Sequence, residues 1–477
     1  MTAIDWDRYR RRAREAETLG CRGRVVRVTG LTVESQGPPV GTGEVCDIHL
    51  ADGRRVRAEV VGFHHAHRIL LPLEPIDGIS PNDAVVARNQ LRSIRLGPEV
   101  LGRVLDGLGR PIDGQGPLQG PDQWRVDGDS PPPLSRRPIT EPLPLGIRVF
   151  DGVLTCGKGQ RVGIFSGSGV GKSTLLGEIA RVSDADVNVL ALVGERGREV
   201  RQFLEHSLGP EGLARSVVVV ATSDAAPIQR VKAAPLAIAV AEYFRDQGKD
   251  VLFMMDSVTR LAQAQREIGL AAGEPPTTKG YCPSVFSLLP RLTERLGSAE
   301  TGSITGMITV LVEADDMNDP VADCMRSLLD GHVVLSRRLA ELGHHPAVDI
   351  LQSISRLMAA CTTPEHYQAA QKLRAIYATY QGAEDLINIG ALKSGSNPRI
   401  DTAVSLIDRV NAFLIQGLGT RSTMADTVRR LLEITQSWDY LMPSDEEAAG
   451  PDAASAAGPD AAPGAAPAAS IAGSDVS

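Results

Sequence analysis

The feature that most restricts the fold of this chain is a glycine-rich loop with an apolar run before it and a helix-length segment after it. The loop spans residues 166–174, the apolar run covers 161–165, and the following segment extends to Arg181. Glycines let successive backbone N–H groups curl around phosphate oxygens, and the N-terminus of a helix adds positive potential. This order of elements predicts a phosphate-binding loop within an α/β domain.

Lys172 and Ser173 give the loop its chemistry, because a lysine at this position reaches the β- and γ-phosphates and the next hydroxyl can ligate Mg²⁺. The first position of the usual pattern is Ser166 instead of glycine. Serine keeps the loop intact unless that position needs a positive φ. We expect a nucleotide to be bound by the loop residues Gly167, Ser168, Gly169, Val170, Gly171, Lys172, Ser173 and Thr174.

Short apolar runs alternate with helix-length segments around this loop. The runs are rich in β-branched residues and read as buried strands. Such alternation predicts a mainly parallel, doubly wound sheet. The expected strands are 161–165, 187–193, 216–221, 251–255 and 307–312.

The region before the alternating segments is of a different kind. Residues 21–96 contain short β segments bounded by Gly, Pro or Asp-Gly, which is typical of a small barrel or sandwich. A stretch rich in Gly, Pro and Asp, 107–133, separates these segments from the alternating region, and we assign 97–363 to the α/β domain. The strands expected in the first region are 24–28, 44–50, 55–61 and 68–72.

The last part of the chain is predicted to be helical. The segments 365–380, 401–416 and 424–437 have helical periodicity and no strand-like run lies between them, so we predict a helical domain over 364–440. Residues 441–477 are mostly Ala, Pro, Gly, Ser and Asp, which cannot bury a core. We expect this tail to be disordered.

Residues 1–20 can form an amphipathic helix with two alternative uses. Arginines cluster largely away from its apolar stripe. The segment is either a docking helix for a partner or a solvated extension. No apolar run follows, so a secretory signal is not expected. The stripe consists of Trp6, Tyr9, Ala13, Ala16 and Leu19.

Charge, hydropathy and cysteine usage exclude several classes of protein. The net charge is −8, but the tail 441–477 holds six acidic residues and no basic one, so the rest of the chain is near −2. This gives no global reason to expect nucleic-acid binding. Apolar stretches fall far short of the roughly 20 residues that span a bilayer. The six cysteines contain no C-x-x-C pair, which favours reduced thiols and a cytoplasmic protein.

Two carboxylates follow strands of the predicted sheet. Asp256 ends the run 251–255 and is a candidate for the metal side of the site, with a helix N-cap as the alternative. Glu195 comes just after 187–193 and could polarise the attacking water, or could instead cap a helix. Ligands gather at the carboxyl ends of parallel strands, so both could face the phosphate loop.

Several motifs together resemble the rotary ATPase family over about residues 22–440. They are GRVLDGLGRPIDGQG at 102–116, the loop that ends at Thr174, GERGREV at 194–200 and PAVDILQSISR at 346–356. Within that family, REIGLAAGEPPTT at 266–278 is similar to the ATPase of type III protein export. The segment 386–398, with LINIGA and SGSNP, is similar to the flagellar branch rather than the injectisome branch.

The resemblance implies a small N-terminal β-barrel, a central RecA-like P-loop domain and a helical C-terminal domain. It also implies ATP and Mg²⁺ as ligands. Lys172 and Ser173 would bind phosphate and Mg²⁺, and Glu199 and Asp256 would support the metal's water shell.

For hydrolysis, the resemblance implies that Glu195 activates water and that Arg260 braces the site. Arg356 would be an arginine finger. In ATP synthase relatives the catalytic glutamate and the finger lie on different kinds of chain, whereas here one chain holds both. A ring of identical chains, expected to be a hexamer, could place Arg356 of each subunit against its neighbour's γ-phosphate.

Two departures from the family concern the adenine pocket. His345 stands where the family usually has tyrosine, and Leu418 where ATP synthase relatives have an aromatic residue. We expect weaker stacking of the base at His345 and Leu418. For the pair His344 and His345 we expect a loop imidazole bonded to the backbone rather than a metal site, because no third ligand stands at a suitable spacing.

The leading hypothesis is an ATP-hydrolysing homo-oligomer that energises export of flagellar proteins at the inner face of the cytoplasmic membrane. Its expected partners are a stator-like regulator at the N-terminal helix, a central stalk-like protein, export substrates with their chaperones, and an export gate. The alternatives are an injectisome ATPase, a hexameric RNA translocase and a non-catalytic subunit. Phe63 is the only aromatic residue in 22–95, which disfavours RNA binding, and Glu195 disfavours a non-catalytic role.

Overall fold

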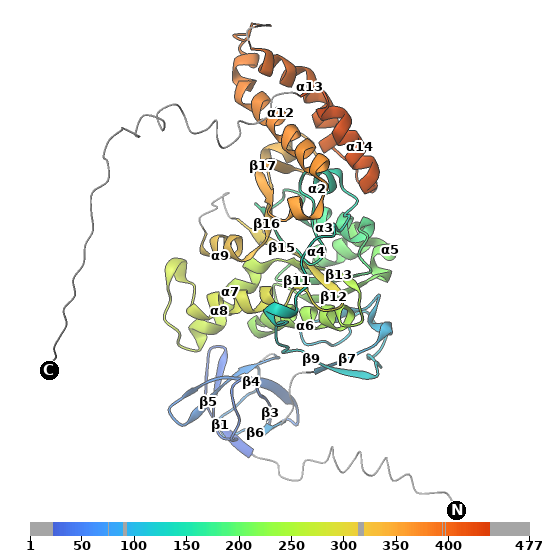
Figure 1. The fold of residues 1–477 in the computed structure, drawn as a ribbon. Helices are drawn as coiled ribbons and strands as arrows, with labels where there is room; N and C mark the ends of the chain where they lie inside the picture. The colour runs from blue at the N-terminus through green and yellow to red at the C-terminus, as the bar shows by residue number, and fades with distance from the viewer. Residues whose placement is uncertain are drawn as a thin grey trace, which may run out of the picture.

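The computed structural model describes residues 22–438 except Pro75, 89–92, 313–318, Ser394 and Ser396. A β-barrel, a central sheet covered by helices and a bundle of helices follow one another along the length of the molecule (Figure 1). The predictions for the N-terminal helix and for the tail lie outside the described residues.

The barrel closes through six strands in the order β1-β2-β5-β4-β3-β6. Its interior is filled by alternating apolar residues such as Val25, Ile48 and Leu70, which are all buried. The sequence predicted four of these strands and missed β2 and β6, which are short. The strands are β1 (Arg22–Thr29), β2 (Thr32–Gln36), β3 (Val45–His49), β4 (Arg55–His64), β5 (His67–Pro72) and β6 (Ala84–Ala87).

The central sheet has the order β17-β16-β10-β15-β13-β11-β12-β8, with β14 beside β15. All neighbouring pairs are parallel except β16 with β17 and β14 with β15, which confirms the predicted mainly parallel sheet. The strands are β8 (Val104–Asp106), β10 (Arg161–Ser166), β11 (Val187–Val193), β12 (Ser216–Ala221), β13 (Asp250–Asp256), β14 (Gly297–Ser298), β15 (Ser303–Leu311), β16 (Gly331–Leu335) and β17 (Val348–Ser355). A separate pair is formed by β7 (Ser93–Leu96) and β9 (Asp122–Arg125).

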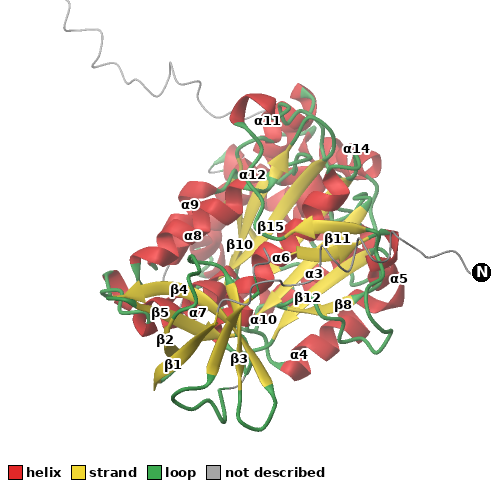
Figure 2. Ribbon diagram, turned by 90° about the horizontal axis from the view of Figure 1, so that it is seen from below, coloured by secondary structure: helices red, strands yellow, loops and turns green. Residues whose placement is uncertain are grey.

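Helices cover both faces of this sheet (Figure 2), so its strands are apolar on both sides. Along β11, Leu190 and Leu192 belong to one core cluster and Val189 and Ala191 to the other. The first cluster includes α3 and the C-terminal helices, and the second includes α6, α7 and α8. The helices are α2 (Arg148–Val153), α3 (Lys172–Val182), α4 (Gly197–Gln202), α5 (Gly209–Ala214), α6 (Pro227–Arg245), α7 (Val258–Ala271), α8 (Pro283–Glu294), α9 (Pro320–Leu328), α10 (Arg337–Glu341) and α11 (Met358–Cys361).

The C-terminal region is helical, as predicted. Its helices are α12 (Pro364–Asn388), α13 (Pro398–Leu414) and α14 (Met424–Thr435). Side chains of Thr363, Asn397 and Thr423 cap their N-termini. Gln416, in the loop after α13, is buried and bonds to backbone atoms of Gly146 and Arg148, which fixes this loop on the central domain.

Properties of the helices and the cysteines of the described residues were predicted from composition. None of the helices in the described ranges is long and apolar enough to cross a membrane. The cysteines in the described part of the chain are all unpaired, and burial raises the pKa of Cys46 to about 12, which suits inert thiols.

Candidate active site

The glycine-rich loop joins β10 to α3 and has the conformation that a phosphate loop requires. Gly169 and Gly171 have φ angles of 79° and 91°, in the left-handed region that favours glycine. Ser166 is the last, extended residue of β10 and needs no positive φ. Serine is therefore compatible with the first position of the loop.

A cavity of about 420 Å³ opens beside this loop. Val170 does not line the cavity, because its side chain is buried in the core against α3. Phe203 and Gln202 also line it, although no pattern in the sequence pointed to them. The predicted residues that it brings together are Gly167, Ser168, Gly169, Gly171, Lys172, Ser173, Thr174, Glu195, Glu199 and Arg260.

Asp256 lies directly under the loop, because β13 is separated from β10 only by β15. Its Oδ1 is 2.6 Å from Lys172 Nζ, and its Oδ2 accepts a hydrogen bond of 3.3 Å from the Ser173 hydroxyl. Thr309 on β15, which the sequence did not single out, donates to Oδ1 at 2.9 Å. A hydroxyl and a carboxylate side by side are the oxygen ligands that Mg²⁺ prefers, so these residues fit a magnesium ion.

Glu195 follows β11 and points its carboxyl toward the same lysine, with Oε1 3.9 Å from Lys172 Nζ. Burial, reinforced by the nearby charge of Asp256, raises the pKa of Glu195 to about 7, although Lys172 opposes the shift. A carboxyl with this pKa can gain or lose a proton near neutral pH.

Glu199 is a hydrogen-bond partner of Glu195. The hydrogen bond from Glu195, together with Arg196 at 3.0 Å, lowers the pKa of Glu199. When the pair holds one proton, these shifts favour that proton on Glu195 and the negative charge on Glu199.

Gly194 allows the chain to pass close to Arg260 on α7. Its φ is 75°, and a Cβ at this position would lie 2.7 Å from the Cβ of Arg260. A side chain at residue 194 would push Arg260 away from the cavity wall that it forms.

The segments that carry His345 and Leu418 both bond to Glu178 on α3, outside the cavity. His345 Nε2 lies 3.0 Å from one Glu178 oxygen, and the N–H of Gly419 donates to the other at 2.6 Å. Burial would raise the pKa of Glu178, but these two bonds lower it overall. Leu418 is 62% exposed. The backbone-bonded imidazole considered for this pair is His344, which contacts the carbonyl of Pro346 at 3.2 Å.

Arg356 is exposed and does not line the cavity of its own chain. Its N–H donates to Asp330 O at 3.1 Å and its Nη1 to Leu329 O at 3.3 Å. Asp330 bonds to Arg161 at the first residue of β10, whereas the phosphate loop follows the last residue. At about 3.3 Å per residue, the two positions are about 17 Å apart along the strand.

A second arginine, Arg337 at the start of α10, does reach the loop. Its Nη2 donates to the carbonyl oxygen of Ser168 at 3.2 Å. No sequence motif had pointed to this arginine.

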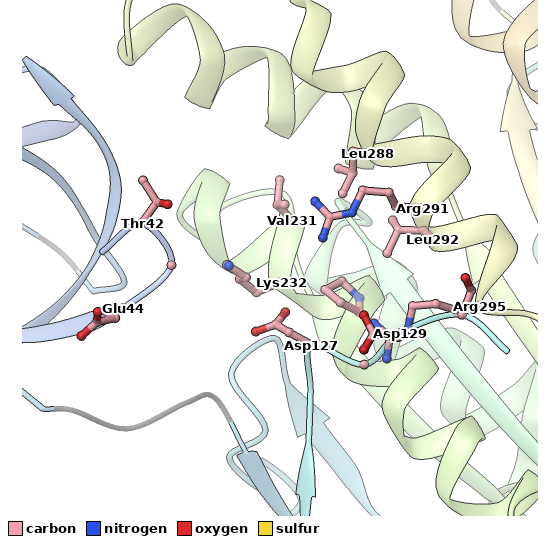
Figure 3. Close-up of a pocket in the computed structure, with 14 residues that line it drawn as sticks. Thr42, Glu44, Asp127, Asp129, Val231, Lys232, Leu288, Arg291, Leu292 and Arg295 are labelled. Atoms are coloured by element: carbon pink, nitrogen blue, oxygen red, sulfur yellow. The ribbon is translucent and has the colours of Figure 1, made fainter. Parts of the chain in front are cut away.

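A larger cavity of about 900 Å³ lies between the barrel and the central domain (Figure 3) and contains none of the predicted site residues. Two of its cations already have buried carboxylate partners. Lys232 lies 2.5 Å from Glu59 of the barrel, and Arg295 lies 2.6 Å from Glu242. The first pair joins the barrel to the central domain, and the second lies within the central domain.

The loop with its lysine and hydroxyl, the aspartate that ends a buried strand and the glutamate beside them define a P-loop nucleoside triphosphatase with a RecA-like sheet. Family models agree. The nucleotide-binding domain of the ATP synthase alpha/beta family matches residues 146–355, its beta-barrel domain matches 25–89, and the T3SS EscN ATPase C-terminal domain matches 362–433.

Comparison with similar proteins shows which family of P-loop nucleoside triphosphatases the chain resembles. The chain is 51% identical over 415 residues to the flagellum-specific ATP synthase of Bacillus subtilis, covering 87% of this chain and 95% of that one. It is 49% identical over 415 residues to the type 3 secretion system ATPase of Xanthomonas euvesicatoria, covering 87% and 94%. The chain therefore belongs to the family of flagellum-specific ATP synthases and type 3 secretion system ATPases, and it is an ATP-hydrolysing enzyme, as the motifs predicted.

The solved structure of the assembled ATPase EscN, from the type III secretion system of enteropathogenic E. coli, has the same fold. It is 44% identical, with a TM-score of 0.82 over 87% of this chain and all of that one. EscN in complex with its central stalk EscO gives a TM-score of 0.81 at 43% identity. The predicted order of barrel, P-loop domain and helical domain is thus confirmed.

Proposed function

We propose that this chain is the Mg-ATP-driven motor of flagellar type III protein export and that it acts as a ring of identical subunits. One observation supports the ring: the chain has Glu195, the proposed catalytic base, at its own cavity and an exposed arginine, Arg356, at the other end of β10. Because Arg356 does not line its own cavity, we propose that a neighbouring copy uses it. Heterologous contacts that close into a ring supply such a neighbour.

The geometry supports the catalytic roles that we propose. Lys172 would exchange its carboxylate partners for the β- and γ-phosphates of ATP, which offer a stronger negative charge. Glu195 would accept a proton from the attacking water, and Arg356 of the neighbour would stabilise charge on the γ-phosphate. Ser173 and Asp256 would hold Mg²⁺, which neutralises phosphate charge when bound.

Supporting roles are proposed for Glu199 and Arg260. Glu199 is bonded to Glu195 and would keep that carboxyl oriented next to the metal's water shell. Arg260 would brace the cavity wall at Gly194. Omitting Mg²⁺ and adding a chelator should abolish hydrolysis, and full activity without divalent metal would contradict the role of Ser173 and Asp256.

We propose that the adenine base sits by His345 and Leu418. Glu178 fixes both segments on α3, the helix that begins with Lys172, so the base and phosphate sites share one rigid element. A histidine and an exposed leucine offer less ring surface than two aromatic residues, so the site should discriminate weakly between purines.

We propose partners for this chain from its resemblance to the export ATPases and from what is known of the EscN structures. EscN is known as an assembled ATPase and in complex with a central stalk, EscO. For this chain we propose a hexamer with a central stalk-like protein, a stator-like regulator at residues 1–20, and export substrates with chaperones that pass to an export gate. We place this assembly in the cytoplasm, at the inner face of the cytoplasmic membrane, with no nucleic acid.

Co-purification from the native cell tests the export function. The Glu195→Gln chain is the bait of choice, because it should bind ATP and remain assembled. Recovery of hook or filament subunits with their chaperones supports the flagellar assignment. Recovery of virulence effectors instead would assign the chain to an injectisome.

A second co-purification, with a chain that lacks residues 1–19, tests the docking role of that segment. If the truncated chain still recovers the regulator, residues 1–19 are not its docking site.

A further inference from the structure

Gln160 is a fully buried polar residue in the turn that leads into β10, far from the phosphate loop. Its relative exposure is 0%. The Oε1 atom accepts a hydrogen bond of 2.8 Å from the N–H of Gly157. The Nε2 group donates to Ser355 Oγ at 3.1 Å and to Asp330 O at 3.3 Å. Both ends of the amide are therefore occupied.

The groups that Gln160 contacts are those that hold the backbone of Arg356. Ser355, the preceding residue, donates its hydroxyl to Thr155 O at 2.7 Å. The carbonyl of Asp330 also accepts the N–H of Arg356 at 3.1 Å. The Gln160 side chain, just before β10, thus bonds to the residue before β16 and to the last residue of β17.

The surrounding packing leaves this arrangement little freedom. A Cβ at Gly331 would lie 2.6 Å from Ile354 O and 3.4 Å from Gln160 Nε2, so only glycine fits. The carboxylate of Asp330 accepts hydrogen bonds from the backbone N–H and the guanidinium of Arg161 at 2.9 and 3.1 Å. The backbone at residue 356 is therefore fixed from both sides, whereas the Arg356 side chain is exposed.

We propose that Gln160 is a positioning residue that sets Arg356 for use by the neighbouring subunit, an inference that rests on the proposed action of Arg356 in trans. An exposed arginine has many rotamers, so its reach is defined only if its backbone is held in place. A misplacement of about 1 Å at a catalytic group can lower the rate about 100-fold. Loss of the Gln160 amide should thus reduce kcat and leave the KM for ATP nearly unchanged.

The test combines steady-state kinetics with mixed rings. Gln160→Leu should lower kcat about 10- to 100-fold. In exchange-competent mixtures it should regain activity with Glu195→Gln, whose Arg356 is intact, but not with Arg356→Ala, which lacks the same function. The matched control is Gln265→Leu, the same substitution at a glutamine that bonds to Ser284, and it should keep the normal kcat.

The outcomes separate this inference from the proposed function. Normal kcat for Gln160→Leu, or recovery with Arg356→Ala but not with Glu195→Gln, overturns the positioning role. If Arg356→Ala and Glu195→Gln fail to complement each other, the action in trans itself is wrong. If Gln160→Leu does not fold, Ser355→Ala, which removes the hydroxyl that accepts from Gln160 and donates to Thr155 O, should give the same complementation pattern. A normal kcat for that variant overturns the inference.

Discussion

The two ends of β10 differ in packing: the carboxyl end is open and the amino end is closely packed. At its carboxyl end, Ser166 leads into an open loop, where a Cβ on Gly169 or Gly171 would meet no atom within 4 Å and a cavity of about 420 Å³ adjoins. At its amino end, Gln160 is buried with both ends of its amide hydrogen-bonded. One end is open to a ligand, as the proposed function requires, and the other end is closely packed around the backbone that carries Arg356.

The charged residues near the two ends of β10, Lys172 and Arg356, differ in the partners that surround them. Lys172 is surrounded by carboxylates of its own chain, at 2.6 Å from Asp256 and 3.9 Å from Glu195. Within the described residues, the Arg356 guanidinium has a hydrogen bond only to the carbonyl of Leu329. The lysine therefore has carboxylate partners in its own chain, whereas the only hydrogen-bond partner of the Arg356 guanidinium in the described residues is an uncharged carbonyl, as its proposed use by a neighbour requires.

Removing the cation at the ligand-receiving end should have the largest effect. Lys172→Ala should abolish ATP hydrolysis, because the β- and γ-phosphates lose their fixed positive charge, and each charge-assisted contact contributes roughly 1.5–3 kcal/mol. Hydrolysis by the purified variant is the measurement, with the exposed Lys249→Ala as control. Unchanged turnover would show that the carboxyl end of β10 is not the catalytic end.

Removing the arginine at the other end should be nearly as severe. Arg356→Ala should lower kcat about 1,000-fold or more, because transition-state charge on the neighbour's phosphate goes uncompensated. ATP binding to the variant, followed with a fluorescent analogue, should be little changed. A normal kcat for Arg356→Ala would show that Arg356 takes no part in hydrolysis and that the amino end of β10 has only a structural role.

Glu195→Gln separates binding from chemistry at the carboxyl end. The amide keeps the shape but accepts protons poorly, so kcat should fall roughly 100- to 10,000-fold while Mg-ATP still binds. If binding is lost and turnover of the bound fraction is normal, Glu195 has a structural role instead.

The pKa of Glu195 predicts a pH profile. This pKa is raised to about 7 by burial and by Asp256, and the carboxyl must be deprotonated to accept a proton from water. The kcat/KM for ATP should therefore rise with pH and level off above about 7, since this ratio reports the free enzyme. The range from pH 5.5 to 8 extends roughly one pH unit or more to either side of a pKa of about 7. A flat profile over this range would mean that the pKa of Glu195 has its ordinary value.

The smallest effect is expected at the base site. GTP and ATP should give kcat/KM values within about tenfold, because an aromatic stack contributes only roughly 0.5–1.5 kcal/mol. His345→Tyr should shift the ratio toward ATP, at the cost of the hydrogen bond to Glu178. Strong ATP preference in the unmodified enzyme would show that other residues select the base.

The sequence was informative wherever a local pattern determines structure. Buried parallel strands are continuous apolar runs, so 187–193 and 216–221 were predicted with the observed bounds of β11 and β12. The loop at 166–174 was evident because glycine spacing and flanking elements are contiguous. In contrast, β17 was missed, because it alternates in burial at the edge of the sheet.

Contacts between distant segments could not be predicted from the sequence. Thr309 reaches Asp256 only because β15 lies between β10 and β13, and no local pattern encodes that order. Glu178 contacts His345 and Gly419 from two other regions, and Gln160 contacts Ser355 across 195 residues. A buried Gln or Glu in an apolar segment is a weak signal, and its partner becomes visible only in three dimensions.

The use of Arg356 by a neighbouring subunit can be tested by the ATPase rate of a mixture of Arg356→Ala and Glu195→Gln chains under conditions where ring subunits exchange. Each chain alone should be nearly inactive. In randomly mixed rings, about a quarter of the interfaces join an intact Glu195 to a neighbour's intact Arg356. Action in trans predicts recovery of a comparable fraction of the normal rate, and a mixture that exchanges fully but stays as inactive as its components would contradict it.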